Sequence, residues 1–231
     1  MDNLLTDLRY AVRVLRARPA LAAAAVLSLA IGVGPVAALF SIVDALGFRP
    51  LPVRDPGGLL QVTTLTRGRP GQVSYPDFID IRERSRLLTD LVVSGTQMFN
   101  LRGDGQVPEV VVGATVSGDY FQTLGVRPSL GRPFLPDEDR TPGAAMVAMI
   151  SDRLWRRRFG ADPAILGKTI QLTRERCTIV GIVPAGFAGT DPILAPDVWV
   201  PAMAWPAFNR GVEETLHARE RRELTLLARL A

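Results

Sequence analysis

The segment Gly160–Thr169, GADPAILGKT, ends in Gly-Lys-Thr, as does a loop that binds nucleotide phosphates. Such a loop has another glycine five residues before Gly167, because the backbone amides between the two glycines wrap the phosphates. Asp162 occupies that position, and its carboxylate would face the phosphate. We therefore predict a short structural turn at Ala164–Leu166, a bend at Gly167 and a strand that starts at Lys168.

Nucleophiles, bases and metal ligands are scarce in this chain. No serine has glycine at both the −2 and +2 positions, so there is no nucleophile elbow. His217 lies in a charged stretch and is expected on the surface, whereas Cys177 alternates with apolar residues and is expected to be buried and inert. One Cys and one His exclude a disulfide framework, a Cys/His zinc site and an HExxH site. We predict no catalytic, metal-binding or cofactor-binding residue.

Two charged clusters could bind ligands. The acidic run Asp137–Asp139 could hold a cation, but adjacent carboxylates point apart and no glycine-turned ligand loop follows, so a solvated loop is favoured. The run Arg156–Arg158 beside Trp155 invites a nucleic-acid interpretation. Lys+Arg is 27 and Asp+Glu is 23, and a net charge of +4 is small for that role. On a short helix Trp155 and Phe159 share a core face, which leaves the arginines solvated or paired with carboxylates.

The elements that position these residues begin with an apolar segment. The 25 residues from Pro19 to Val43 carry no charged side chain. As a helix they would be about 37 Å long, enough to cross a hydrocarbon core of about 30 Å. A buried core helix is the alternative, but one this long is uncommon in a small domain. We predict a transmembrane helix over 19–46, and its length favours a retained anchor over a cleaved signal peptide.

The flanks of this segment predict its orientation. Residues 1–18 place apolar side chains at helical spacing and are expected to form an amphipathic helix on the membrane surface. Arginines are more numerous before the span than after it, which places the N-terminus in the cytoplasm and the following domain outside it. They are Arg9, Arg13, Arg16 and Arg18 before the span, and Arg49 and Arg54 after it.

Small residues recur every four positions along the predicted span, at Ala30, Gly34 and Ala38, so they share one helix face. Such a face lets a second helix approach closely. The alternative is that Ala and Gly are simply frequent in this segment. If the face is used, its partner comes from another chain, because no second apolar stretch of 18 residues follows; a homodimer is one possibility. Pro35 is expected to bend the helix.

Residues 48–231 form the predicted extracytoplasmic domain. Short strands alternate with short helices and no βαβ unit repeats, which favours an α+β fold. Asp77 is a possible N-cap, and Ser151 or Asp152 is expected to cap a helix. The segment Val126–Gly143 is expected to be an ordered loop. The predicted strands are Leu59–Leu65, Leu91–Leu101, Glu109–Val116, Met146–Ile150, Lys168–Leu172, Cys177–Val183, Val198–Pro201 and Leu224–Leu230, and the predicted helices are Asp77–Ser85, Gly118–Leu124 and Asp152–Phe159.

Seven segments in chain order carry a resemblance to a known family. Together they resemble the periplasmic core domain of MacB-like ABC transporter permeases, within the FtsX-like permease superfamily, and most of all the large duplicated orphan permeases. The segments are LSLAIGVG in the predicted span, FRPLPVRDPGGLL at 48–60, VSYPDFIDIRERS at 73–85, VSGDYFQTLGVRPSLGRPF at 116–134, SDRLWRRRFGADPAILGKTIQL at 151–172, TIVGIVPAGF at 178–187 and DVWVP at 197–201.

The resemblance implies an inner-membrane permease whose large domain stands in the periplasm and which works with a cytoplasmic ABC ATPase. Two features depart from the family: Pro35-Val36 replaces a small polar pair, and the C-terminal membrane part with three more helices is missing. We expect a non-enzymatic domain that couples through protein–protein contact. A stand-alone anchored binding or sensor module, or a non-functional permease fragment, is the alternative, and a secreted enzyme ranks last.

Overall fold

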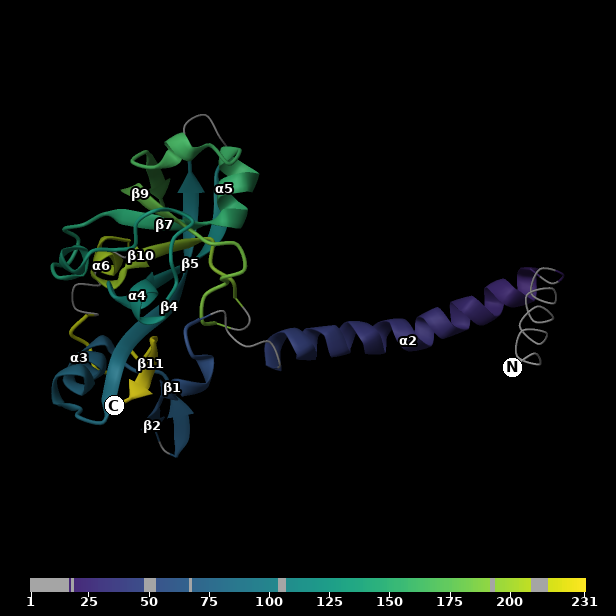
Figure 1. Ribbon diagram of the computed structural model, residues 1–231, viewed down its shortest axis with the longest axis horizontal. Helices are drawn as coiled ribbons and strands as arrows, with labels where there is room; N and C mark the ends of the chain where they lie inside the picture. Colours follow the sequence, from purple (N-terminus) through teal and green to yellow (C-terminus); the bar gives the residue numbers. More distant parts are fainter. Residues whose placement is uncertain are drawn as a thin grey trace. The chain divides into compact units, whose positions relative to one another are not determined.

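The computed structural model describes residues 17, 19–47, 53–66, 68–103, 107–191, 194–208 and 216–231. The chain divides into two units, residues 1–50 and 51–231. In the first unit, helix α2 runs over Pro19–Gly47 and contains Pro35 (Figure 1). Counted over the described residues, no helix is both long and apolar enough to cross a membrane. The span predicted over 19–46 is thus not confirmed, and all but one residue of the predicted amphipathic helix 1–18 lie outside the description.

The second unit is a mixed α+β domain. Nine described strands form one sheet, while β2 and β3 pair separately as an antiparallel hairpin. The strands are β1 Leu59–Val62, β2 Thr64–Thr66, β3 Arg69–Gly71, β4 Leu88–Arg102, β5 Glu109–Val116, β6 Leu130–Gly131, β7 Val147–Ser151, β8 Thr169–Leu172, β9 Glu175–Val183, β10 Val198–Pro201 and β11 Thr225–Leu230. The helices are α3 Tyr75–Arg84, α4 Tyr120–Thr123, α5 Asp152–Phe159 and α6 Trp205–Phe208, with 3-10 turns η1 Pro56–Gly58, η2 Pro136–Asp139, η3 Pro163–Ile165 and η4 Ala202–Ala204.

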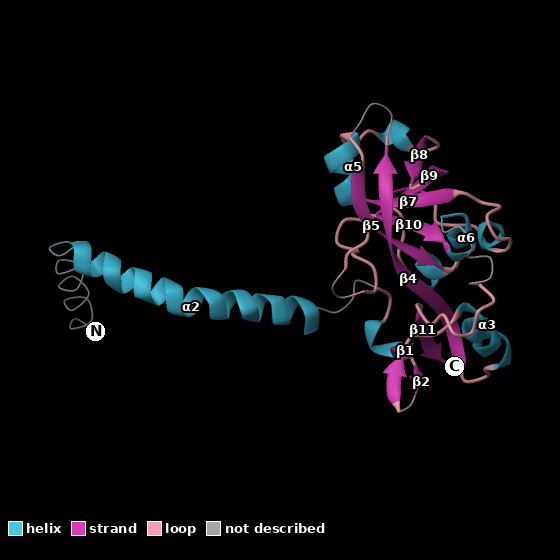
Figure 2. Ribbon diagram, turned by 180° about the vertical axis from the view of Figure 1, so that it is seen from behind, coloured by secondary structure: helices cyan, strands magenta, loops and turns pink. Residues whose placement is uncertain are grey.

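Six strands of the sheet close into a ring. In order around the ring, β4 pairs with β5, β5 with β10, β10 with β7, β7 with β9, β9 with β8, and β8 with β4. The β5–β10 and β7–β9 pairs are parallel and the others antiparallel. The closing β4–β8 contact is short, with only Leu101↔Leu172 and Arg102↔Gln171 in register. Figure 2 shows the ring strands gathered at one end of the unit and β1, β2 and β11 at the other.

Strand β4 joins the two ends because it is 15 residues long. Its first half pairs with β11 and its second half with β5. All six ring strands contribute side chains to one buried cluster, in which Phe99 of β4 contacts Phe208 with ring centroids 4.9 Å apart. Gly113 on β5 faces this cluster, and a Cβ there would overlap the Phe99 ring. Only glycine therefore lets β5 approach the aromatic core of the ring.

Two further clusters pack outside the ring. An aromatic cluster lies under α4 and includes Tyr120, Phe121, Phe134, Phe187 and Trp199, all buried. A third cluster lies under α3 and joins its buried Phe78 to the apolar face of β11. Burying these apolar faces is the main stabilising contribution to such a layered domain.

The structure confirms most of the predicted elements and corrects several boundaries. Helix α3 starts at Tyr75, and Ser74 rather than Asp77 is its N-cap. Asp77 is the reciprocal member of a capping box, because its backbone N–H donates to the Ser74 hydroxyl at 3.2 Å while its carboxylate accepts from the Ser74 N–H at 3.4 Å. The predicted strand Leu59–Leu65 is split at Thr63 into β1 and β2, and the predicted loop Val126–Gly143 contains β6 and η2.

Candidate functional site

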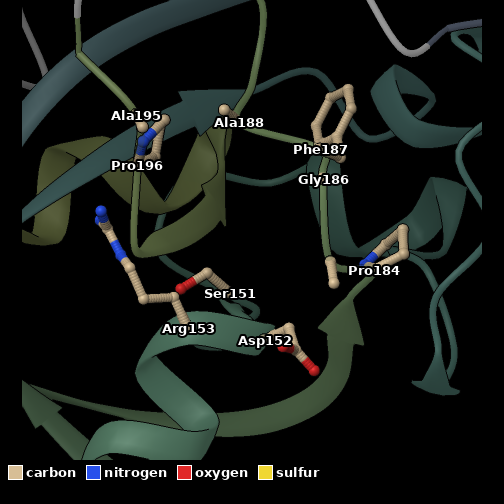
Figure 3. Close-up of a pocket in the computed structure, with 10 residues that line it drawn as sticks. Ser151, Asp152, Arg153, Pro184, Gly186, Phe187, Ala188, Ala195 and Pro196 are labelled. Carbon is tan, nitrogen blue, oxygen red and sulfur yellow. The ribbon is translucent and has the colours of Figure 1, made fainter. Parts of the chain in front are cut away.

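A hollow of about 220 Å³ lies beside the start of α5. Its other wall is the segment between β9 and β10. Figure 3 shows Ser151 and Arg153 at the start of α5, facing the side that carries Ala195 and Pro196. The residues that line it are Ser151, Asp152, Arg153, Pro184, Ala185, Gly186, Phe187, Ala188, Ala195 and Pro196.

Two of the lining residues, Ser151 and Arg153, bind the carboxylate of Asp197, which follows the lining residue Pro196 and is only 5% exposed. The Ser151 hydroxyl donates to Asp197 Oδ1 at 2.7 Å and accepts from the Leu154 N–H at 2.9 Å, which caps α5. Arg153 donates to the same Asp197 oxygen from Nε and Nη2, at 3.1 and 2.9 Å. Arg157 Nη2 stands 3.6 Å from the other oxygen, Asp197 Oδ2. Two guanidinium groups thus compensate a nearly buried carboxylate.

This geometry holds segments together and does not activate a nucleophile. A catalytic serine needs a base that is free to take its proton and a hydroxyl that is free to attack. Here the Ser151 oxygen is engaged as both a helix cap and a donor, and Asp197 is engaged by arginine. The Ser151 N–H also donates to the Asp197 carbonyl at 2.9 Å. The network therefore fixes β7, α5 and the residues before β10 as one body.

The arginine run on α5 is paired with carboxylates, as one of the two sequence alternatives predicts. Arg156 Nε lies 2.7 Å from Asp152 Oδ2, one helical turn away. Arg157 and Arg158 both bind Glu109 of β5, at 2.6 and 2.9 Å. Trp155 and Phe159 pack half-buried against the ring cluster. Because these arginines already neutralise acidic groups, the run offers little free charge to a nucleic acid.

The Gly-Lys-Thr segment is a structural turn, as predicted. Asp162 accepts from the Ala164 N–H at 2.9 Å and so begins η3. Gly167 adopts a φ of +76°, which is the left-handed conformation that favours glycine. Lys168 Nζ lies 3.4 Å from the Asp162 carboxylate. The lysine that would contact a phosphate is therefore paired with Asp162, the residue that stands where a phosphate-binding loop has its first glycine.

The acidic run departs from its prediction as a solvated loop. Only Asp137 is exposed, while Glu138 forms a two-pronged pair with Arg132 at 2.9 and 2.6 Å. Asp139 accepts from the Gly118 N–H at 2.8 Å and the Met203 N–H at 2.9 Å, so it ties η2 to η4 and to the turn before α4. Burial, and to a smaller extent the charge of Asp119, raises the pKa of Asp139 to about 6.

The remaining reactive residues lie where the sequence predicts. Cys177 is buried in the ring cluster, and burial raises the pKa of its thiol to about 12, which makes it a poor nucleophile. His217 is exposed. Among the described residues there is no group of three or more His, Cys, Asp or Glu side chains that could hold a metal ion.

Sequence reasoning missed Asp197 and Asp139 as the centres of polar networks. For Asp197 a signal was present, because a carboxylate directly precedes the apolar strand β10 and needs a buried partner. Asp139 gave no comparable signal. Its neighbours in sequence are equally acidic, and its bonding partners are the distant backbone groups of Gly118 and Met203.

The sequence profile of the family described as "MacB-like periplasmic core domain" matches residues 22–230. The chain belongs to this family. The match covers most of α2 and almost all of the α+β unit, so the MacB-like domain is the main part of the chain.

Curated relatives carry the name macrolide export ATP-binding/permease protein MacB. The protein of Burkholderia cenocepacia is 36% identical over 95 residues, which is 40% of this chain and 14% of that protein. The protein of Burkholderia thailandensis is 36% identical over 93 residues, 39% of this chain and 14% of that one. This chain therefore matches a small part of the length of these relatives.

Two solved structures share the fold. The periplasmic region of MacB from Actinobacillus actinomycetemcomitans has a TM-score of 0.54 at 13% identity, covering 82% of this chain and 78% of that one. The extracellular domain of the noncanonic ABC-type transporter YknZ from Gram-positive bacteria has a TM-score of 0.52 at 12% identity, covering 74% and 81%. The α+β unit thus has the fold of MacB-like extracytoplasmic domains.

Proposed function

We propose that this chain is the membrane-anchored periplasmic domain of an ABC-type transporter permease, and that it acts through protein–protein contact with no catalysis of its own. The observation that carries the proposal is the family match over residues 22–230, together with the shared fold. The polar networks support it, because the side chains best suited to chemistry are engaged in structural ties at Ser151, Asp197 and Asp139.

The anchor in this proposal is α2, which crosses the inner membrane over 19–46. Its 25 residues from Pro19 to Val43 lack charge, and the arginine-rich flank keeps the N-terminus in the cytoplasm. The face of Ala30, Gly34 and Ala38 packs against a second copy or another permease helix. The energy source is a cytoplasmic ABC ATPase that acts through parts of the permease outside this chain, in keeping with the ATP-binding part in the name of the relatives.

The test is topology. Two reporters are each fused after Ala231. Alkaline phosphatase is active only outside the cytoplasm, whereas green fluorescent protein fluoresces in the cytoplasm and stays dark when it is exported unfolded. We expect phosphatase activity and no fluorescence. The matched control places the same reporters after Arg18, before the span, where the result should reverse. Fluorescence without phosphatase activity at Ala231 would overturn the proposed orientation and with it the periplasmic role.

A further inference from the structure

A second hollow, of about 310 Å³, lies at the closure of the strand ring, between β4, β8 and β9. Its polar lining comes from Arg102, Thr169, Gln171 and Arg176. It shares no residue with the hollow beside α5. None of its residues belongs to the Ser151, Asp139 or Asp162 networks described above.

The strand register explains why two arginines meet there. Arg102 is the cross-strand partner of Gln171, and Gln171 is the partner of Arg176. Cross-strand partners project from the same face of a sheet, with Cβ atoms about 5 Å apart. The three side chains therefore form a row of guanidinium, amide and guanidinium. Leu101 and Cys177, their chain neighbours, are fully buried inside the ring, so the row lies on the outer face.

The charge of this row is uncompensated within the described part of the chain. Several arginines elsewhere in the unit lie against carboxylates, as Arg132 does with Glu138 and Arg158 with Glu109. No carboxylate among the described residues pairs with Arg102 or Arg176, and both side chains are exposed. Arg102 and Arg176 lie two strands apart, about 10 Å between backbones, with the uncharged Gln171 between them. Two long guanidinium side chains at this spacing can converge on one anionic segment from both sides.

The surroundings of the hollow indicate what kind of anion fits. Along β4 the same outer face carries Asn100 and then Met98, which is 62% exposed. Val110 of β5 is the cross-strand partner of Asn100 and is 63% exposed. A phosphate ion or a lipid headgroup would use only the arginines. A peptide segment with acidic and apolar residues in succession would use both the cationic hollow and the apolar surface beside it.

We propose that the hollow at the β4–β8 closure binds an acidic, partly apolar segment of a partner protein, with its carboxylates on Arg102 and Arg176 and its apolar side chains on Met98 and Val110. Such a ligand would bridge β4 and β9 across β8, where only two residue pairs close the ring. This inference deepens the proposed function by naming the chemistry of one contact partner. It rests on the proposed function only in that the partner is then a periplasmic protein.

The experiment is a calorimetric titration of the full chain in a neutral detergent. The probe is the capped peptide Asp-Glu-Leu-Asp-Glu-Leu, and its amide counterpart Asn-Gln-Leu-Asn-Gln-Leu is the neutral control. We expect the acidic peptide to bind and the neutral one to fail. Binding should weaken about tenfold or more in the R102Q/R176Q variant and severalfold in M98S/V110S. The control R174Q/R86Q removes two other exposed arginines and should stay within about twofold of the parent.

Several outcomes would overturn the proposal. They are no binding of the acidic peptide, equal binding of the neutral one, or equal loss in R174Q/R86Q and R102Q/R176Q. Displacement of the peptide by inorganic phosphate at similar concentration would show a simple anion site, and capture of phosphatidylglycerol vesicles in preference to peptide would show a lipid site. The R102E/R176E variant, tested with Lys-Arg-Leu-Lys-Arg-Leu, should recover binding if the hollow is the site. The titration uses the purified chain and does not depend on topology. The peptide can therefore fail to bind while the fusions confirm the orientation, and it can bind while the fusions contradict the orientation.

Discussion

Replacing Asp139 by asparagine should change how the stability of this domain depends on pH. The folded chain raises the pKa of Asp139 from 3.8 to about 6 through burial. The folded state therefore binds a proton more tightly than the unfolded state does, and unfolding releases that proton between these pH values. The free energy of unfolding contributed by Asp139 thus rises as the pH falls from 7 towards 4. Asparagine does not titrate, so the D139N variant lacks this rise.

The size of the effect follows from the two pKa values. Between pH 7 and pH 5 the wild-type chain should gain about 1 kcal/mol relative to D139N, and more on approaching pH 4. Glu138 and Asp162, whose pKa values are lowered, titrate in both proteins, so their opposite contribution cancels in the difference. With a denaturant slope of about 2 kcal/mol/M, the two urea midpoints should separate by roughly 0.5 M over this range.

The assay is urea unfolding of the full chain in neutral detergent, followed by tryptophan fluorescence. All three tryptophans, Trp155, Trp199 and Trp205, belong to the α+β unit, so the signal reports its unfolding. The exposed neighbour variant D137N is the matched control and should track the wild type at every pH. We compare the free energy of unfolding of the wild type with that of D139N at each pH. If this difference stays constant from pH 7 to pH 5, or if the wild type loses stability relative to D139N as the pH falls, the raised pKa of Asp139 is refuted.

Three further predictions concern the core and the helix face. S151A removes both the cap of α5 and the hydrogen bond to Asp197, and should lower the free energy of unfolding by about 2 kcal/mol in urea. G113A should lower it by about 1–3 kcal/mol, because the added Cβ overlaps the buried Phe99 ring. G34I should weaken association of α2 in a membrane two-helix reporter, because a large side chain keeps a partner helix away.

The two core variants have matched controls. G57A adds a methyl group with no neighbour within 4 Å and should leave the urea midpoint almost unchanged. For S151A, the threonine variant keeps a hydroxyl and should recover much of the loss; equal loss in both would show that volume rather than hydrogen bonding matters. An unchanged reporter signal for G34I would remove the argument for the small-residue face of α2.

Local chemistry placed most of the elements correctly. The hairpin of β8 and β9, the helix α5 with its Ser151 cap and the turn at Gly167 follow from turn residues and apolar periodicity within a few positions. Ser74 and Asp77 stand three residues apart, which is the spacing of a capping box whose first residue is the N-cap. The signal for Ser74 was therefore present in the sequence, and the prediction of Asp77 as N-cap was wrong.

Strand partners were not predictable in the same way. The apolar run 59–65 looks continuous, yet β1 pairs with β11, far along the chain, while β2 pairs with its neighbour β3. The division at Thr63 reflects these different partners and no local break in the pattern. The parallel pairs β5–β10 and β7–β9, and hence the ring, likewise depend on contacts between distant segments.

By itself the sequence determined the α+β class, the turns, the family resemblance and the burial of Cys177, because these depend on residue type and short-range spacing. Only the tertiary structure decided that Asp139 is partly withdrawn from solvent and bonded to two backbone N–H groups, that Ser151 meets Asp197, and that Arg102 and Arg176 flank one hollow. The bonding partners lie 64 residues apart for Asp139 and Met203 and 46 apart for Ser151 and Asp197. Burial and charge compensation are properties of the surroundings of a side chain, and the fold alone brings those surroundings together.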